Sequence, residues 1–216
     1  VNANSVSYIS GSRGVASLYS IPFTTEAEVI FPKKWRLKDK NHYAYTTLSA
    51  SLFGMHTARQ KSHTSGENPG KLAWHADDVA NFQIYACRKT LQEDATYSNG
   101  YTNKDAFFQL TSSQDGLALN LTSSVFADVY ADKKWNFAVR VKPRKHPLAS
   151  YVTGALKPDV DNPYIIEFYG VNNDLDIISN EFLLTGTLST AQGEAFLSSS
   201  KRVYAGAHRQ DFTGSV

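Results

Sequence analysis

Apolar and polar residues alternate with a period of two along much of this chain, which is the pattern of half-buried β-strands. In residues 23–31 the apolar side chains share one face, and Glu26 and Glu28 lie on the other. Residues 135–141 alternate in the same way, beginning with Trp135. Further strands are predicted at residues 43–55, 82–87, 107–110, 117–121 and 164–169, around Val203 and Tyr204, and at 212–216.

Turn-forming residues separate these segments, so that strand candidates recur about every 10–20 residues, as β-sandwiches require. Only residues 190–199 have a helical pattern. The chain has 216 residues, 42% of them hydrophobic, with 12 Tyr, 12 Phe and 3 Trp to fill a core. We therefore predict one all-β domain over residues 1–216. Because residue 1 is Val and the last strand breaks off, we expect a fragment of a larger protein.

The net charge, the single cysteine and the absence of certain motifs argue against several classes of function. A formal net charge of +2 gives no electrostatic case for a specific nucleic-acid partner. No apolar run approaches the ~20 residues that a transmembrane helix needs. Cys87, the single cysteine, has no intrachain disulfide partner and is predicted to be a buried, inert thiol. Neither a nucleophile-elbow motif nor a phosphate-binding loop is present.

Three motifs carry a family resemblance. Trp135-Asn-Phe-Ala-Val139 is similar to the tryptophan strand of laminin-G-like domains, and Val203-Tyr-Ala-Gly-Ala207 resembles a later strand of that family. Phe212-Thr-Gly-Ser-Val216 resembles the start of its closing strand. The resemblance implies an antiparallel jelly-roll β-sandwich of the concanavalin A-like type, with long loops and little helix. It also implies that the tryptophan strand crosses the middle of one sheet. The family's short hairpin after that strand is replaced here by residues 142–163.

A calcium site is one candidate. Oxygen-bearing side chains follow Gly170 at alternate positions, which suits a hard cation. The predicted ligands are Asn172, Asn173, Asp174 and Asp176, with Asp128 and Asp132 as helpers. The same residue types are also preferred in plain turns.

Glycan contact is a second candidate, because aromatic side chains in loops can stack on sugar rings. The predicted stacking residues are Trp35, Tyr97 and Tyr101. Two basic runs are predicted to contact sulfated glycan or another anionic surface if they lie together. This basic patch consists of Lys33, Lys34, Arg36, Arg140, Lys142, Arg144 and Lys145. Such runs also serve as solvated loops that keep sheet edges apart from other chains.

The leading hypothesis is a non-catalytic module of a larger adhesion, surface or virion structural protein, located outside the cell, on its surface or on a virus particle. It would contact glycans or neighbouring proteins through rim loops and one sheet face. The alternative is an assembly element that docks on other chains through an edge strand. A third reading is a glycoside hydrolase-like enzyme that uses Glu26 and Glu28. The pattern favours a solvated strand face for these two glutamates over a catalytic pair.

Overall fold

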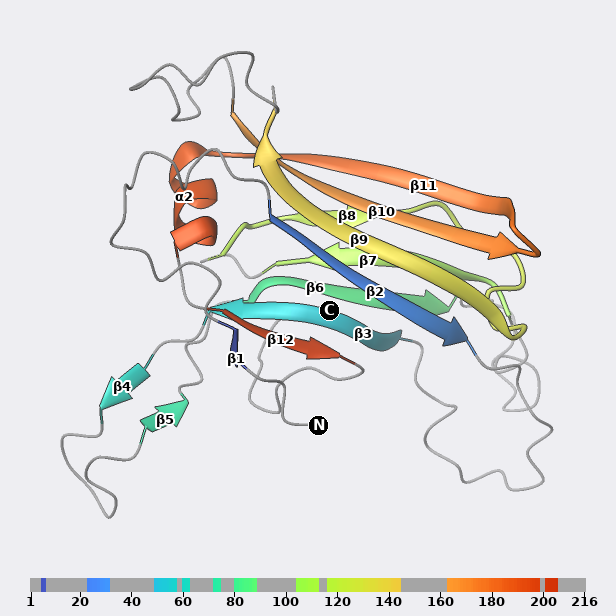
Figure 1. Ribbon diagram of the computed structural model, residues 1–216, viewed down its shortest axis with the longest axis horizontal. Helices are drawn as coiled ribbons and strands as arrows, with labels where there is room; N and C mark the ends of the chain where they lie inside the picture. Colours follow the sequence, from blue (N-terminus) through green and yellow to red (C-terminus); the bar gives the residue numbers. More distant parts are fainter. Residues whose placement is uncertain are drawn as a thin grey trace, which may run out of the picture.

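In the computed structural model, the described residues form two large antiparallel β-sheets, a two-stranded ribbon and one short helix (Figure 1). The described residues are 5–6, 23–31, 49–57, 60–62, 72–74, 80–88, 104–112, 116–144, 163–198 and 201–205. The elements are β1 (Ser5–Val6), β2 (Phe23–Phe31), β3 (Ser49–Thr57), β4 (Gln60–Ser62), β5 (Leu72–Trp74), β6 (Ala80–Arg88), β7 (Ala106–Thr111), β8 (Asn120–Thr122), β9 (Lys133–Pro143), β10 (Tyr164–Asp174), β11 (Ile177–Leu188), α2 (Thr190–Ser198) and β12 (Lys201–Ala205).

Each large sheet combines strands from distant parts of the chain. The six-stranded sheet has the order β1-β12-β3-β6-β7-β8, and the four-stranded sheet has the order β11-β10-β9-β2. Strands β3, β6, β7 and β8 run as one meander, and β9, β10 and β11 as another. The amino-terminal β2 completes the second meander, and the carboxy-terminal β12 joins the first. A separate two-stranded ribbon is formed by β4 and β5.

The strongest periodic segments are confirmed as strands. Intermediate and exposed residues alternate along β2 until the buried Phe31, as its period of two predicts. Strand β9 buries Trp135, Phe137, Val139 and Val141 on one face, and it lies between β2 and β10 inside its sheet. The short helical segment is also confirmed, as α2.

Three predicted boundaries differ from the structure. Strand β3 begins at Ser49, and residues 43–48 lie outside the described part of the chain. The strand predicted at 117–121 is reduced to β8, because residues 116–117 form a turn and Ala118 has a φ of 51°. The polar segment predicted to begin at residue 142 begins two residues later, since Lys142 and Pro143 still belong to β9. The strand predicted at 212–216 lies outside the described residues.

The predicted loop after Gly170 is mostly strand. Strand β10 continues to Asp174, and only Leu175 and Asp176 form the turn into β11. Both residues have positive φ, 50° and 64°, as a type I′ hairpin turn requires. Sequence reasoning missed β11 because Ile177, Ile178 and Leu183 are exposed and blur its alternation.

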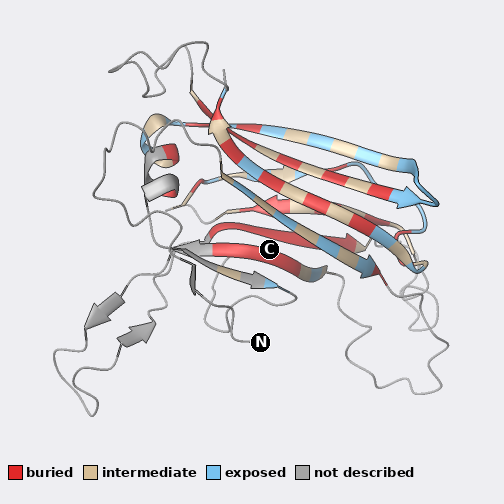
Figure 2. Cartoon of the chain, viewed as in Figure 1, coloured by how far each residue is buried: buried red, intermediate tan, exposed pale blue. Residues whose placement is uncertain are grey.

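Aromatic side chains make up much of the core between the sheets. Figure 2 shows buried residues, in red, along strands of both sheets. The fully buried Phe108 of β7 is at the centre of this core. Its ring lies within 6.0 Å, centroid to centroid, of five other rings, those of Phe31, Phe126, Trp135, Phe137 and Phe182. Burial of an aromatic side chain stabilises a fold by about 1.5–3 kcal/mol. This cluster therefore joins the two sheets.

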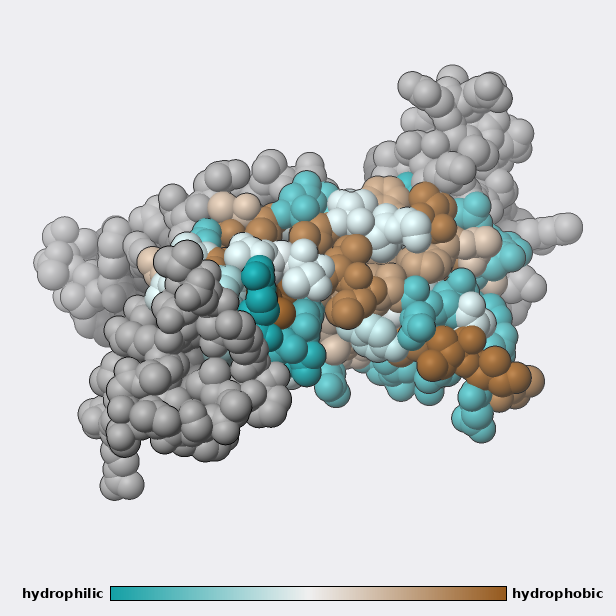
Figure 3. All heavy atoms as spheres, turned by 90° about the horizontal axis from the view of Figure 1, so that it is seen from above, coloured by the Kyte–Doolittle hydropathy of each residue, from teal (hydrophilic) through white to brown (hydrophobic). Residues whose placement is uncertain are grey.

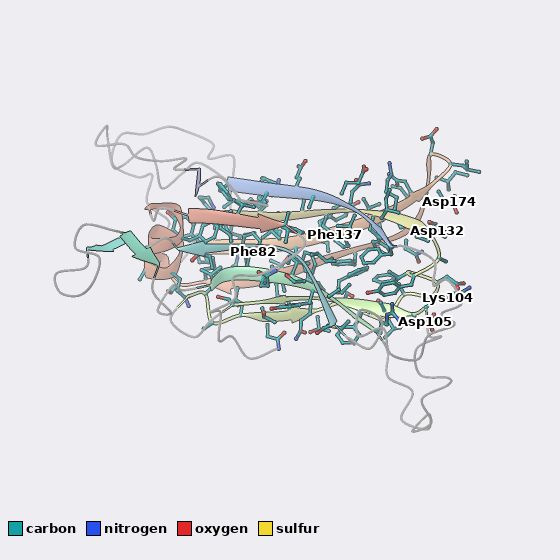
Figure 4. All side chains as sticks on the ribbon, turned by 90° about the horizontal axis from the view of Figure 1, so that it is seen from below. Phe82, Lys104, Asp105, Asp132, Phe137 and Asp174 are labelled. Atoms are coloured by element: carbon teal, nitrogen blue, oxygen red, sulfur yellow. The ribbon has the colours of Figure 1, made fainter. Side chains whose placement is uncertain are left out.

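Helix α2 extends the core at one end of the strands. Phe196 packs against Phe23 of β2 and Phe82 of β6, with ring centroids 5.7 and 6.5 Å apart. The helix also lies close to β10. Gly193 is required there, because a Cβ atom at this position would lie 2.2 Å from the ring of Tyr164. No helix among the described residues is long and apolar enough to cross a membrane. Figure 4 shows Phe82 and Phe137 in the interior between the sheets.

Cys87 is a free and buried thiol, as predicted. Burial raises its pKa, which keeps the group protonated. Its Sγ atom lies 3.8 Å from Oε1 of Gln109 on the neighbouring strand β7, where it acts as a weak donor.

We predict that Phe108→Ala lowers the free energy of unfolding by about 3–5 kcal/mol, because it opens a cavity among five rings. Chemical denaturation followed by far-ultraviolet circular dichroism measures the change. Phe107→Ala is the matched control, since its neighbouring side chain is only partly buried. Equal losses in the two variants would contradict a central role for Phe108.

A candidate ligand-binding groove on the four-stranded sheet

The two large sheets differ in the exposure of their outer faces. In β6 all seven residues from 81 to 87 are buried, on both faces of the strand. Strands β2 and β11 instead alternate between exposed and partly buried residues. Figure 3 looks onto the edge of the sandwich at β11, where polar and apolar side chains are mixed. Among the described strands, the outer face of the four-stranded sheet therefore offers functional groups to solvent along more of its length than β6 does.

Strand register sets the order of side chains on this face. Ala138 of β9 pairs with Glu26 of β2 on one side and with Tyr169 of β10 on the other. In the next outward-facing row, Asn136 pairs with Glu28 of β2. Residues from three strands that are remote in sequence thus form two adjacent rows.

These two rows form a groove with a volume of about 380 Å³. Its lining is Glu26, Ala27, Glu28, Asn136, Phe137, Ala138 and Tyr169. Ala138 forms the floor of the groove, because its side chain is shorter than those of Glu26 and Tyr169 on either side. The volume is within the ~300–1,000 Å³ typical of small-molecule sites. The groove offers two carboxylates, one amide and one phenol ring to a ligand.

Neighbouring side chains hold parts of the groove in place. The Tyr169 hydroxyl donates a hydrogen bond of 3.2 Å to Oε2 of Glu181 on β11. Desolvation raises the pKa of Tyr169, and the bond to Glu181 raises it further, so the phenol stays protonated. Lys134 forms an ion pair of 3.4 Å with Glu28. Within the described part of the chain, Glu26 forms no ion pair and is available to a ligand.

A charge cluster lies beside the groove on β9 and β10. Glu167 accepts hydrogen bonds from Arg140, with Nε at 2.7 Å, and its Oε1 lies 3.1 Å from the Lys142 ammonium group. Burial alone would raise the pKa of Glu167, but the hydrogen bonds and charges of the two cations outweigh it and lower that pKa. Both cations are therefore partly neutralised within the sheet.

The structure places only part of the predicted basic patch. Arg140 and Lys142 share Glu167, and Arg144 donates a hydrogen bond of 3.3 Å to Thr187 of β11. The other four basic residues, Lys33, Lys34, Arg36 and Lys145, lie outside the described residues. The same holds for the predicted stacking residues Trp35, Tyr97 and Tyr101. Sulfated-glycan binding at this patch stays a prediction.

The predicted calcium ligands lie at the β10–β11 hairpin, but they do not converge. Asn172 is buried, and its amide donates to Lys134 O at 2.7 Å and accepts from the Ser179 hydroxyl at 2.5 Å. Asp174 forms an ion pair with Lys133. The remaining ligands, Asn173 and Asp176, are exposed.

The two predicted helpers lie close by. Asp128 and Asp132 are both exposed and have positive φ, 54° and 58°. Asp128 lies 3.6 Å from Lys104, and Figure 4 shows Lys104, Asp105, Asp132 and Asp174 at the same end of the sandwich. No group of three or more acidic, histidine or cysteine side chains suited to a metal occurs among the described residues. Calcium at this end stays a prediction.

Sequence reasoning identified Glu26 and Glu28 but assigned them to a solvated face, and it missed Asn136, Ala138 and Tyr169. The signal for the missed residues was their position in the alternation of β9 and β10, opposite the buried row. Their proximity to β2 depends on the order of the strands in the sheet, and the alternation of residues along one strand does not reveal that order.

Comparisons of this chain with protein-family models, with curated proteins and with solved structures gave no match. The groove is therefore interpreted from its own chemistry.

We predict that Glu167→Gln lowers the free energy of unfolding at pH 7 by about 1–2 kcal/mol, because two charge-assisted contacts are lost. The pKa of Glu167 lies below its ordinary value of 4.5, so its charge stabilises the fold at pH values above 4.5. This contribution disappears as the pH falls through the folded-state pKa. The difference between wild type and variant should therefore shrink on acidification from pH 7 towards pH 3. Urea denaturation at several pH values measures it, with the exposed Glu181→Gln as control. A difference that is constant with pH would contradict this assignment.

We further predict that Asn172→Ala lowers the free energy of unfolding by about 1–3 kcal/mol, because the carbonyl of Lys134 loses its donor. The Ser179 hydroxyl loses its side-chain acceptor and keeps only the 3.2 Å bond to the Asn172 backbone carbonyl. The loss should be equal in calcium and in chelator. Asn173→Ala, one residue further and exposed, should change stability by less than about 0.5 kcal/mol. Thermal denaturation under both conditions tests this. A loss seen only with calcium would assign Asn172 to a metal instead.

Proposed function

We propose that this chain is a non-catalytic carbohydrate-binding β-sandwich that holds its ligand in the groove on β2, β9 and β10. The observation that carries the proposal is the position of Tyr169 across Ala138 from Glu26, with Glu28 and Asn136 in the adjacent row. The groove is open and shallow, which suits a segment of an oligosaccharide.

The groups in the groove match the surface of a sugar. Hydroxyl groups of a sugar donate hydrogen bonds to the carboxylates of Glu26 and Glu28, and the amide of Asn136 both donates and accepts. Bonds to ionised acceptors are about twice as strong as neutral ones. The apolar C–H face of a pyranose packs on an aromatic ring such as that of Tyr169. The bond from Tyr169 to Glu181 holds the ring in position before the ligand arrives.

Strand order supports a concanavalin A-like jelly roll as the finer description of the fold. Each meander is completed by a strand from the opposite end of the chain, and β9, which carries the tryptophan motif, is an interior strand. The Val203 motif lies on β12, in the opposite sheet. A parent protein on a cell or virion surface stays a prediction.

A hydrolase is the less favoured reading of the same groove. Glu26 and Glu28 lie two residues apart on the same face of β2, and Lys134 forms an ion pair with Glu28. Concanavalin A-like glucanases carry their catalytic carboxylates in an E-x-D-x-(x)-E pattern on one strand. Strand β2 lacks the aspartate and the further glutamate of that pattern. An assembly role is the second candidate function, and the exposed edge of β11 favours it.

We predict that Tyr169→Ala and Glu26→Gln each weaken glycan binding about tenfold, because one removes the stacking surface and the other a charged acceptor. Tyr169→Phe should keep most of the affinity, since the ring remains. A glycan array selects the ligand, and isothermal titration calorimetry measures the dissociation constants.

Thr24→Ala, on the same face of β2 but beyond the groove, is the matched control and should bind as wild type. Wild-type binding that survives both groove variants would place the ligand elsewhere. No binding to any glycan would overturn the proposal. Release of shorter sugars during incubation, lost in Glu26→Gln or Glu28→Gln, would favour the hydrolase.

A further inference from the structure

The described part of the two large sheets has four edge strands, and three of them are protected. Edge strands present unpaired backbone groups, and proteins block them by shortness, charge or bulges. Strand β1 has two residues and β8 has three. Strand β2 presents Glu26 and Glu28 on its outward face.

The fourth edge, β11, has little protection. It is 12 residues long and contains no Lys, Arg or Pro, and Glu181 is its single charged residue. Ile177, Ile178 and Leu183 expose 70%, 57% and 59% of their surface. No described strand pairs with its far side, and Figure 1 shows it at the margin of the four-stranded sheet.

One irregularity limits where another strand can pair. The register with β10 shifts between Asn172 and Asn173, so that Ser179 is an extra residue in β11. Such a bulge twists the edge near the turn. From Asn180 to Leu188 the register is continuous. Residues 180–188 therefore form the regular part of the free edge.

We propose that a second copy of this chain pairs with β11, antiparallel across a two-fold axis at Leu183, and joins two four-stranded sheets into one of eight strands. The axis places Leu183 opposite Leu183 of the partner subunit and thus covers an exposed leucine. Glu181 then lies opposite Thr185 of the partner subunit, which is a neutral hydrogen-bonding residue.

Charge disfavours one neighbouring axis, the one at Glu181. An axis at Glu181 would place two carboxylates directly opposite each other, which is destabilising. On the inner face, Phe182 meets Leu184 of the partner subunit, so the apolar row that packs on the core continues across the interface. The strand is thus complementary to itself, as a two-fold interface requires. This inference is independent of the proposed glycan groove.

Sedimentation velocity and light scattering on the full chain test the inference. Wild type should be a dimer, and Leu183→Lys should raise the dimer dissociation constant about tenfold or more, because two like charges meet at the axis. Leu183→Glu should have the same effect. An equimolar mixture of the two variants should associate again, since Lys then faces Glu. Ile30→Lys, at a comparably exposed position on the β2 edge, is the matched control and should remain a dimer.

A wild-type chain that stays monomeric at about 100 μM would overturn the proposal. A dimer that Leu183→Lys leaves intact would also overturn it, as would one dissociated by Ile30→Lys. If both Leu183 variants are monomers with native circular dichroism spectra and their mixture does not associate, the two-fold pairing at Leu183 is wrong. Association of the mixture supports the pairing and shows that each variant is folded.

Discussion

The packing of aromatic rings between the two sheets is the interaction on which the other features of this protein depend. Phe108 from the six-stranded sheet meets Trp135 and Phe137 from the four-stranded sheet, with ring centroids 4.7 and 4.8 Å apart. Each sheet must bury one face, and these rings define which face that is. Since side chains alternate along a strand, a shift of one residue would turn the whole row towards solvent. The core therefore fixes the register of every strand that contacts it.

The chemistry of the outer face follows from that register. When β9 buries Trp135 and Phe137, it turns Asn136 and Ala138 outward, and pairing with β2 brings Glu26 and Glu28 beside them. One step further along β9, Arg140 and Lys142 meet Glu167 instead of open solvent. The face thus consists of a groove with available acceptors and an adjoining region whose charges are already paired.

Sequence patterns predicted individual elements better than their partners. The alternation in residues 23–31 and 135–141 was clear enough to assign both strands and their buried faces. Strand β11 was missed because leucine and isoleucine side chains are exposed along it, which breaks the alternation that predicts a strand. The loop expected after Gly170 was wrong because Asn and Asp, which often mark turns, here continue β10 to Asp174. Asn172 is buried and forms hydrogen bonds with Lys134 and Ser179. The sequence around Asn172 does not indicate these partners.

The sequence by itself determined that the described chain is all-β with a short helix near residue 190, and that Trp135 and the Cys87 thiol are buried. These properties depend on local alternation and composition, which the sequence contains directly. Only the tertiary structure decided that Glu26 lies across Ala138 from Tyr169, more than 140 positions away in the chain, and that β11 is an edge strand among the described strands. Strand order decides such neighbours, and strand order results from how two whole faces pack against each other.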